Sequence, residues 1–101
     1  MNITIRDLAT YDEFVQVRLI QQRCWGFTQG EGLYAPLLNT AARNGGTVLG
    51  AFDGAQMIGF LFGFLGMNAD RRLKLCSQTL GVLPDYRSQG VAARLKWAQR
   101  V

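Results

Sequence analysis

The chain has 101 residues, of which 49% are hydrophobic and 18% charged, a composition that favours one globular domain over a disordered segment. It contains no histidine and only two cysteines, Cys24 and Cys76, which excludes the common zinc sites and any histidine-activated nucleophile. The N-terminus lacks the apolar region of a signal peptide, so we expect a cytoplasmic protein with reduced thiols. The net charge of +4 arises in residues 51–101, because the first half carries equal numbers of basic and acidic side chains.

The first quarter of the chain predicts a short strand followed by an amphipathic helix. Residues 3–6 alternate apolar and polar side chains, which is typical of a strand. Thr10 and Glu13 have the spacing of a capping box, so we expect a helix to begin just after Thr10 and to end at Trp25-Gly26. Helical spacing places four side chains on one buried face: Phe14, Val17, Ile20 and Cys24.

The middle of the chain predicts a second helix and a hairpin of two strands. The helix would begin at Tyr34-Ala35-Pro36, with proline in its first turn, and would end at Asn44-Gly45-Gly46. Strands over residues 47–52 and 56–66 would be joined by a tight turn at Asp53-Gly54. The apolar run in the second strand is too short to cross a bilayer as a helix, and we expect it to be a buried central strand.

A third strand and a last helix flank the stretch in which we expect the functional site. Leu73–Val82 predicts a strand, and Pro84 must end it soon after, because proline cannot donate to a sheet ladder. Residues 91–101 predict a helix. The loop Arg87-Ser88-Gln89-Gly90 places free backbone N–H groups beside a helix N-terminus, an arrangement that suits an anion such as a phosphate.

This stretch resembles the acyl-CoA-binding motif of the GNAT superfamily of N-acetyltransferases, which is written Arg/Gln-x-x-Gly-x-Gly/Ala. Arg87, Gly90 and Ala92 occupy its three fixed positions, and Val82 and Pro84 match the usual end of the preceding strand. The alternative is an ordinary strand, turn and helix with a convenient glycine. Within the superfamily, the chain most resembles a poorly characterised bacterial branch of predicted acetyltransferases.

The resemblance implies acetyl-CoA, or another acyl-CoA, as co-substrate and no metal. The backbone N–H of Val82 would polarise the thioester carbonyl, and the amides of the loop would hold the pyrophosphate. Nine residues are therefore expected to bind the cofactor: Leu80, Gly81, Val82, Arg87, Ser88, Gln89, Gly90, Val91 and Ala92.

The sequence does not identify the general base. Acyl transfer to an amine requires a base or a water chain to remove a proton, yet no carboxylate lies between Asp70 and Asp85. Cys76 has no histidine to activate it as an acyl-carrying nucleophile. We therefore expect direct transfer to a primary amine on a small molecule or a peptide. Three aromatic residues are candidates for the acceptor pocket, with core and loop packing as an equal alternative: Trp25, Phe27 and Tyr34.

The basic surplus of the second half does not indicate a nucleic-acid or membrane partner. Residues 71–74 hold three basic side chains, but they do not form a basic stripe interleaved with aromatic residues. The basic side chains of the last helix fit a solvated face. We expect the surplus to serve the phosphates of CoA.

These elements predict an α/β domain of the α+β kind, with a mostly antiparallel sheet flanked by helices in the order β-α-α-β-β-β-α. Residues 1–101 would be the N-terminal portion of a single GNAT-like domain, because the last helix lacks a stop signal and the closing strands of the family are missing. The full-length protein would be the enzyme, and this fragment alone would be inactive. The alternative is a non-catalytic CoA-binding or self-associating fragment. A homo-oligomer could then form through the exposed edge of Leu73–Val82, unless a missing C-terminal part covers that edge.

Overall fold

The computed structural model describes residues 3–25, 35–67 and 69–100 of the chain. Its elements follow the predicted order, with one 3-10 turn added before the last helix. They are β1 (Ile3–Asp7), α1 (Tyr11–Trp25), α2 (Ala35–Arg43), β2 (Thr47–Asp53), β3 (Gln56–Met67), β4 (Leu73–Val82), the 3-10 turn η1 (Pro84–Tyr86) and α3 (Val91–Arg100).

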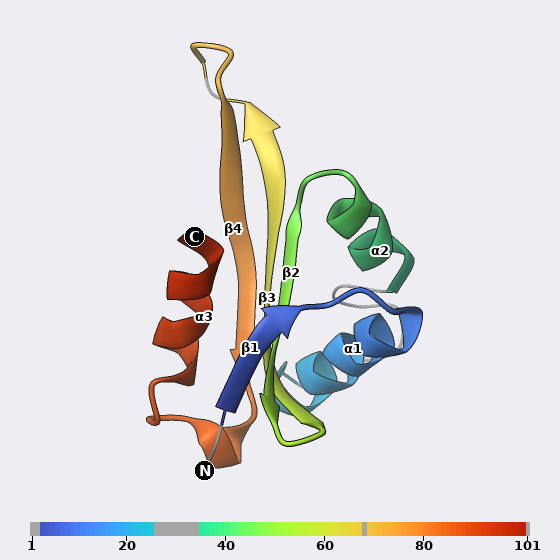
Figure 1. The fold of residues 1–101 in the computed structure, drawn as a ribbon, viewed down its shortest axis with the longest axis vertical. Helices are drawn as coiled ribbons and strands as arrows, with labels where there is room; N and C mark the ends of the chain where they lie inside the picture. The colour runs from blue at the N-terminus through green and yellow to red at the C-terminus, as the bar shows by residue number, and fades with distance from the viewer. Residues whose placement is uncertain (1–2, 26–34, 68, 101) are drawn as a thin grey trace.

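The four strands form one antiparallel sheet in the order β1-β2-β3-β4. Helices α1 and α2 cover one face of this sheet, and α3 covers the other (Figure 1). Within the described part of the chain, no strand pairs with the outer side of β4. The predicted fold class is therefore confirmed. None of the described helices is long and apolar enough to span a membrane.

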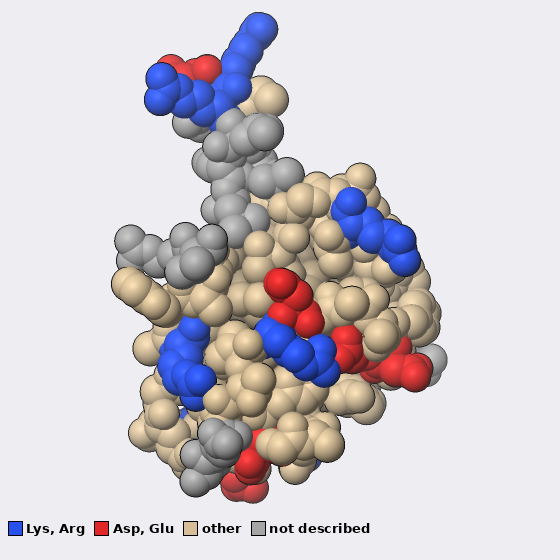
Figure 2. Space-filling view, viewed as in Figure 1, with Lys and Arg blue, Asp and Glu red and all other residues tan. Residues whose placement is uncertain are grey.

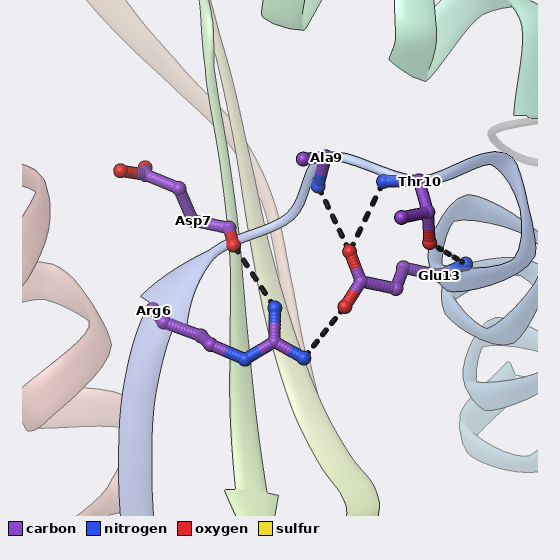
Figure 3. Close-up of polar contacts among 5 residues, drawn as sticks. All are labelled: Arg6, Asp7, Ala9, Thr10 and Glu13. Carbon is purple, nitrogen blue, oxygen red and sulfur yellow. Dashed lines mark hydrogen bonds and ion pairs between the residues drawn. The ribbon is translucent and has the colours of Figure 1, made fainter.

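The predicted capping box is present at the start of α1 (Figure 3). The Glu13 N–H donates to Thr10 Oγ1 at 3.2 Å, and Glu13 Oε1 accepts from the N–H groups of Thr10 at 3.1 Å and Ala9 at 2.9 Å. Glu13 Oε2 also lies 2.6 Å from Arg6 Nη2, an ion pair that the sequence did not predict. Partial burial would raise the pKa of Glu13, but the Arg6 guanidinium and the two amides outweigh it and lower that pKa to about 2.

The hydrophobic core fills the space on both faces of the sheet. The predicted stripe of α1 is buried at Phe14, Val17 and Ile20, while Cys24 is partly buried. On the opposite face, Leu95 anchors α3 and is completely buried. These contacts fix α3, and thereby the position of the loop that precedes it.

Strand β3 is buried over residues 57–63 and exposed at Phe64 and Met67. Residues 57–62 lie in the core, and Gly59 allows close packing, because a Cβ there would lie 3.1 Å from the carbonyl oxygen of Gly81. Phe64 and Met67, by contrast, are 40% and 60% exposed. The prediction that the whole apolar run is core is wrong at its far end, because β3 and β4 continue as a hairpin beyond the helices (Figure 1). The space-filling view shows charged side chains at the tip of this hairpin (Figure 2).

The turn between β2 and β3 lies one residue later than predicted. Asp53 still pairs with Gln56, so the two-residue loop is Gly54-Ala55. Gly54 has φ +63°, as the first central residue of a type II′ turn requires. Gly54 thus supplies the left-handed residue of a tight turn, as predicted, but it is the first rather than the second residue of the loop.

Candidate functional site

The candidate site begins where β4 leaves the sheet. The Leu83 N–H still donates to the Ile58 carbonyl at 2.8 Å, and Pro84 then opens η1. The Arg87 N–H closes this turn by donating to the Pro84 carbonyl at 3.3 Å, so the prediction that this amide is free is wrong. Proline suits the first position of such a turn, because its missing N–H would have no partner there.

The loop between η1 and α3 has two residues in the left-handed region. Ser88 has φ +66° and Gly90 has φ +80°. A Cβ added at Gly90 would meet no atom within 4 Å, so the position is open to a ligand from outside. The glycine is required by its backbone angle rather than by crowding within the protein.

Helix α3 presents free amides at its N-terminus. Its first backbone hydrogen bond runs from the Arg94 N–H to the Gly90 carbonyl, at 3.1 Å. The N–H groups of Val91, Ala92 and Ala93 therefore precede the first intrahelical bond, and no partner for them is found among the described residues. These donors, together with the positive end of the helix dipole, favour an anion at this point.

The register of β4 determines which of its amides face away from the sheet. Leu83 faces β3, since its N–H donates to the Ile58 carbonyl of that strand. Peptide groups alternate in direction along a strand, so the N–H and C=O of Val82 and Leu80 point away from β3. With no strand on that side among the described residues, these groups lie along the open edge of the sheet.

Residues from both sets, Leu80 and Val82 of β4 and Val91 and Ala92 of α3, line one cavity of about 430 Å³. Its lining includes eight of the nine residues predicted to bind the cofactor; Gln89 is absent from it, and Nε2 of that side chain donates to the Asp85 carbonyl at 3.4 Å. A hollow of about 480 Å³ beside Trp97 is larger, so volume alone does not select the site. The selection rests on the unpaired amides. The residues lining the site cavity are Leu80, Gly81, Val82, Tyr86, Arg87, Ser88, Gly90, Val91 and Ala92.

Tyr86 is the lining residue that the sequence prediction missed. Its hydroxyl donates to Asp53 Oδ2 at 2.7 Å, which ties η1 to the end of β2. This hydrogen bond raises the pKa of Tyr86 above its ordinary value, so the phenol, which is protonated at neutral pH in any case, keeps its proton further into the alkaline range. No local signal could reveal the contact, because 33 residues separate its partners.

The carbonyl oxygen of Val82 accepts two hydrogen bonds from side chains. Arg87 Nε donates at 3.1 Å, and Cys24 Sγ, from the last turn of α1, donates at 3.4 Å. The sequence assigned neither role. Arg87 was expected only as a member of the loop, and Cys24 only as a core residue.

The expected gathering of basic residues around the loop is not found. Arg87 is the basic residue that lines the cavity. Arg71 and Arg72 lie before the start of β4, at the other end of this strand of 10 residues, and therefore about 30 Å from the loop. Arg94 is not simply solvated, since its Nη2 donates to the Ile3 carbonyl at 2.8 Å.

The remaining candidates stay predictions. Phe27 and Tyr34 lie outside the described residues, and Trp25 is placed only as the last residue of α1. Cys76 pairs in register with Phe64 on β3, in the half of β4 remote from the cavity. Within the described ranges, no group of three or more histidine, cysteine or acidic residues could hold a metal ion.

The fold and the loop define a class of protein, and comparison with solved structures agrees with it. An aminoglycoside acetyltransferase, meta-AAC0020, from an uncultured soil metagenomic sample superposes with a TM-score of 0.82 at 17% identity, over 97% of this chain and 67% of its own. A glucosamine N-acetyltransferase region in a fungal multi-domain β-N-acetylglucosaminidase superposes with a TM-score of 0.78 at 19% identity. The match covers 98% of this chain and 12% of the fungal protein. A GNAT family acetyltransferase from Brucella melitensis, in complex with acetyl-CoA, superposes with a TM-score of 0.67 at 13% identity. The match covers 94% of this chain and 64% of the Brucella enzyme.

The chain has the fold of the GNAT-superfamily N-acetyltransferases. It spans about two thirds of the length of the first of these enzymes. No family model and no curated protein sequence matches the chain. The likeness therefore lies in the three-dimensional arrangement, and it shows the fold alone.

Proposed function

We propose that the full-length protein is an N-acyltransferase that moves an acetyl or other acyl group from acyl-CoA to a primary amine. One observation carries the proposal: the same cavity is lined by Leu80 and Val82, whose amides point away from β3, and by Val91 and Ala92, whose amides precede the first intrahelical bond of α3. A ligand with a phosphate at one end and a thioester carbonyl at the other would use both sets. The fold of known acetyltransferases supports this assignment.

The chemistry proposed is direct transfer. The Val82 N–H would stabilise the negative charge that develops on the thioester oxygen as the amine attacks. The amine must lose a proton, and the cavity is lined by no aspartate or glutamate. The C–S bond of the thioester then breaks, and we propose that water carries the proton from the amine to the thiolate of CoA, which leaves as the thiol. The acceptor is an amine of a small molecule or a peptide; the soil enzyme with the same fold was crystallised with the aminoglycoside sisomicin.

A proline substitution tests the role of the Val82 amide. Val82→Pro deletes an N–H that faces away from β3, so no ladder hydrogen bond is lost and the edge position tolerates proline. We expect CoA binding, measured by calorimetry, to persist, while acetyl transfer to a panel of amines falls about a hundredfold or more, as when one oxyanion donor is removed. Transfer at the unaltered rate by a folded Val82→Pro protein would refute the proposal.

The second candidate is a non-catalytic, CoA-binding or self-associating fragment. The observation that favours it is the outer side of β4, which has no paired strand in the part of the chain described. Unpaired strand edges associate with other chains. Sedimentation at micromolar concentration tests self-association, and an assay of acetyl transfer by the full-length protein tests catalysis. A full-length monomer that transfers acetyl groups excludes the second candidate. For the compartment we propose the cytoplasm, which is consistent with the free thiol of Cys24.

A further inference from the structure

The Val82 carbonyl is held from two directions at the mouth of the cavity. Arg87 Nε approaches from the loop at 3.1 Å, and Cys24 Sγ approaches from α1 at 3.4 Å. A carbonyl on an open sheet edge would ordinarily be left to water. Here 58 residues separate Cys24 from Val82 and five separate Arg87 from it, so two independent elements converge on one oxygen.

We propose that Arg87 and Cys24 are positioning residues for acyl transfer. The inference rests on the proposed function. In an extended strand, the N–H and C=O of one residue point to the same side, so the hydrogen bonds that fix the Val82 carbonyl also fix the direction of its N–H. That N–H is the group proposed to polarise the thioester, and such a donor is effective only when it is held in place before the reaction.

The arginine connects the two halves of the site. Its Nε is engaged with β4, while the residue itself belongs to the loop and lines the cavity. An anion held at the N-terminus of α3, directly after the loop, would therefore be coupled to the strand amide through one side chain. Lysine cannot replace it, because an ammonium lacks the planar fork in which Nε bonds the carbonyl and the two Nη groups keep their own donors.

The chain offers matched controls for both donors. Arg94→Lys breaks a comparable hydrogen bond, from Arg94 Nη2 to the Ile3 carbonyl at 2.8 Å, on a helix face outside this cavity. Cys24→Ser keeps a donor at the position, whereas Cys24→Ala removes it. The pairs to compare are thus Arg87→Lys with Arg94→Lys, and Cys24→Ala with Cys24→Ser.

The test is the ¹H–¹⁵N signal of the Val82 amide in the full-length protein titrated with CoA and then with acetyl-CoA. In the unaltered protein we expect acetyl-CoA to move the signal downfield relative to CoA, since only acetyl-CoA supplies a thioester carbonyl. Arg87→Lys and Cys24→Ala should abolish most of this difference, while Arg94→Lys and Cys24→Ser retain it. In the full-length enzyme, Arg87→Lys should lower kcat about tenfold, the effect of one charge-assisted hydrogen bond, and leave the KM for acyl-CoA within a few-fold.

The outcomes separate this inference from the function on which it rests. A full-length protein that binds neither CoA nor acetyl-CoA overturns the proposed function, and the positioning role with it. A Val82 signal that responds to acetyl-CoA equally in all four variants overturns the positioning role and leaves the function standing. Should Arg87→Lys fail to fold, the comparison of Cys24→Ala with Cys24→Ser decides alone.

Discussion

Gly90 and Gly54 form a natural pair for measuring how much the loop contributes to ligand binding. Both have positive φ, +80° and +63°, and a Cβ at either position would meet no atom within 4 Å. Alanine at either site should therefore cost only the strain of a left-handed backbone, about 1–2 kcal/mol. For a domain of this size, 1 kcal/mol lowers the melting temperature by about 4–8 °C. The two variants should lose similar stability.

Their effects on CoA should differ. Gly90→Ala adds a methyl group at the cavity and pulls the loop away from the angle that aims the amides of α3, while Gly54→Ala lies in the β2–β3 turn, outside that lining. We expect calorimetry to give a dissociation constant raised about tenfold or more for Gly90→Ala, equivalent to about 1.4 kcal/mol, and unchanged for Gly54→Ala. Equal affinity in the two variants, with equal loss of stability, would refute the placement of the ligand on the loop.

Four further substitutions test other parts of the structure. The folded pKa of Glu13 is about 2 against an ordinary 4.5, so its stabilisation is present above about pH 4.5 and is lost as pH falls toward 2; urea unfolding midpoints of Glu13→Gln should fall below wild type at pH 7 and converge with it at low pH. Ser88→Gly should relieve the strain of a φ of +66° and raise the free energy of unfolding by up to about 1 kcal/mol, which a higher melting temperature would show. Gly46→Ala should destabilise by about 1–3 kcal/mol, because its Cβ would lie 2.8 Å and 2.9 Å from two backbone oxygens. Cys76→Ala should leave acyl transfer in the full-length enzyme within a few-fold, whereas a loss of about a thousandfold would indicate an acyl-cysteine intermediate.

The local features of this fold could be predicted from sequence because their signals lie within a few residues. The capping box needs only Thr10 and Glu13, three positions apart, and the structure contains both of its hydrogen bonds. Pro84 alone predicts the end of β4, and Gly90 alone predicts one of the two left-handed positions in the loop, the other being Ser88. Each of these residues has a backbone preference that acts without regard to the rest of the chain.

Features that depend on packing between distant elements could not be predicted. The ladder between β3 and β4 shifts after Phe62, where the partner changes from Thr79 to Ser77 and leaves Gln78 without a partner in β3. The sequence of β4 has no glycine or proline at that point to signal a bulge. The exposure of Phe64 likewise follows from where the helices end, which its own neighbours do not determine.

The site illustrates the same division between local and distant effects. The free amides of α3 are local, because a helix that begins at Val91 leaves its first donors unpaired in any fold. Those of Leu80 and Val82 are not, because they are open only where no described strand pairs with the outer side of β4. What they bind depends on their common direction, and that depends on distant contacts: Tyr86 with Asp53, and Val82 with Cys24. A variant that weakens either contact should therefore leave the donors of the cavity present but change the direction in which they point. Loss of activity with little loss of stability is the expected signature of such a change, and it separates alignment from folding.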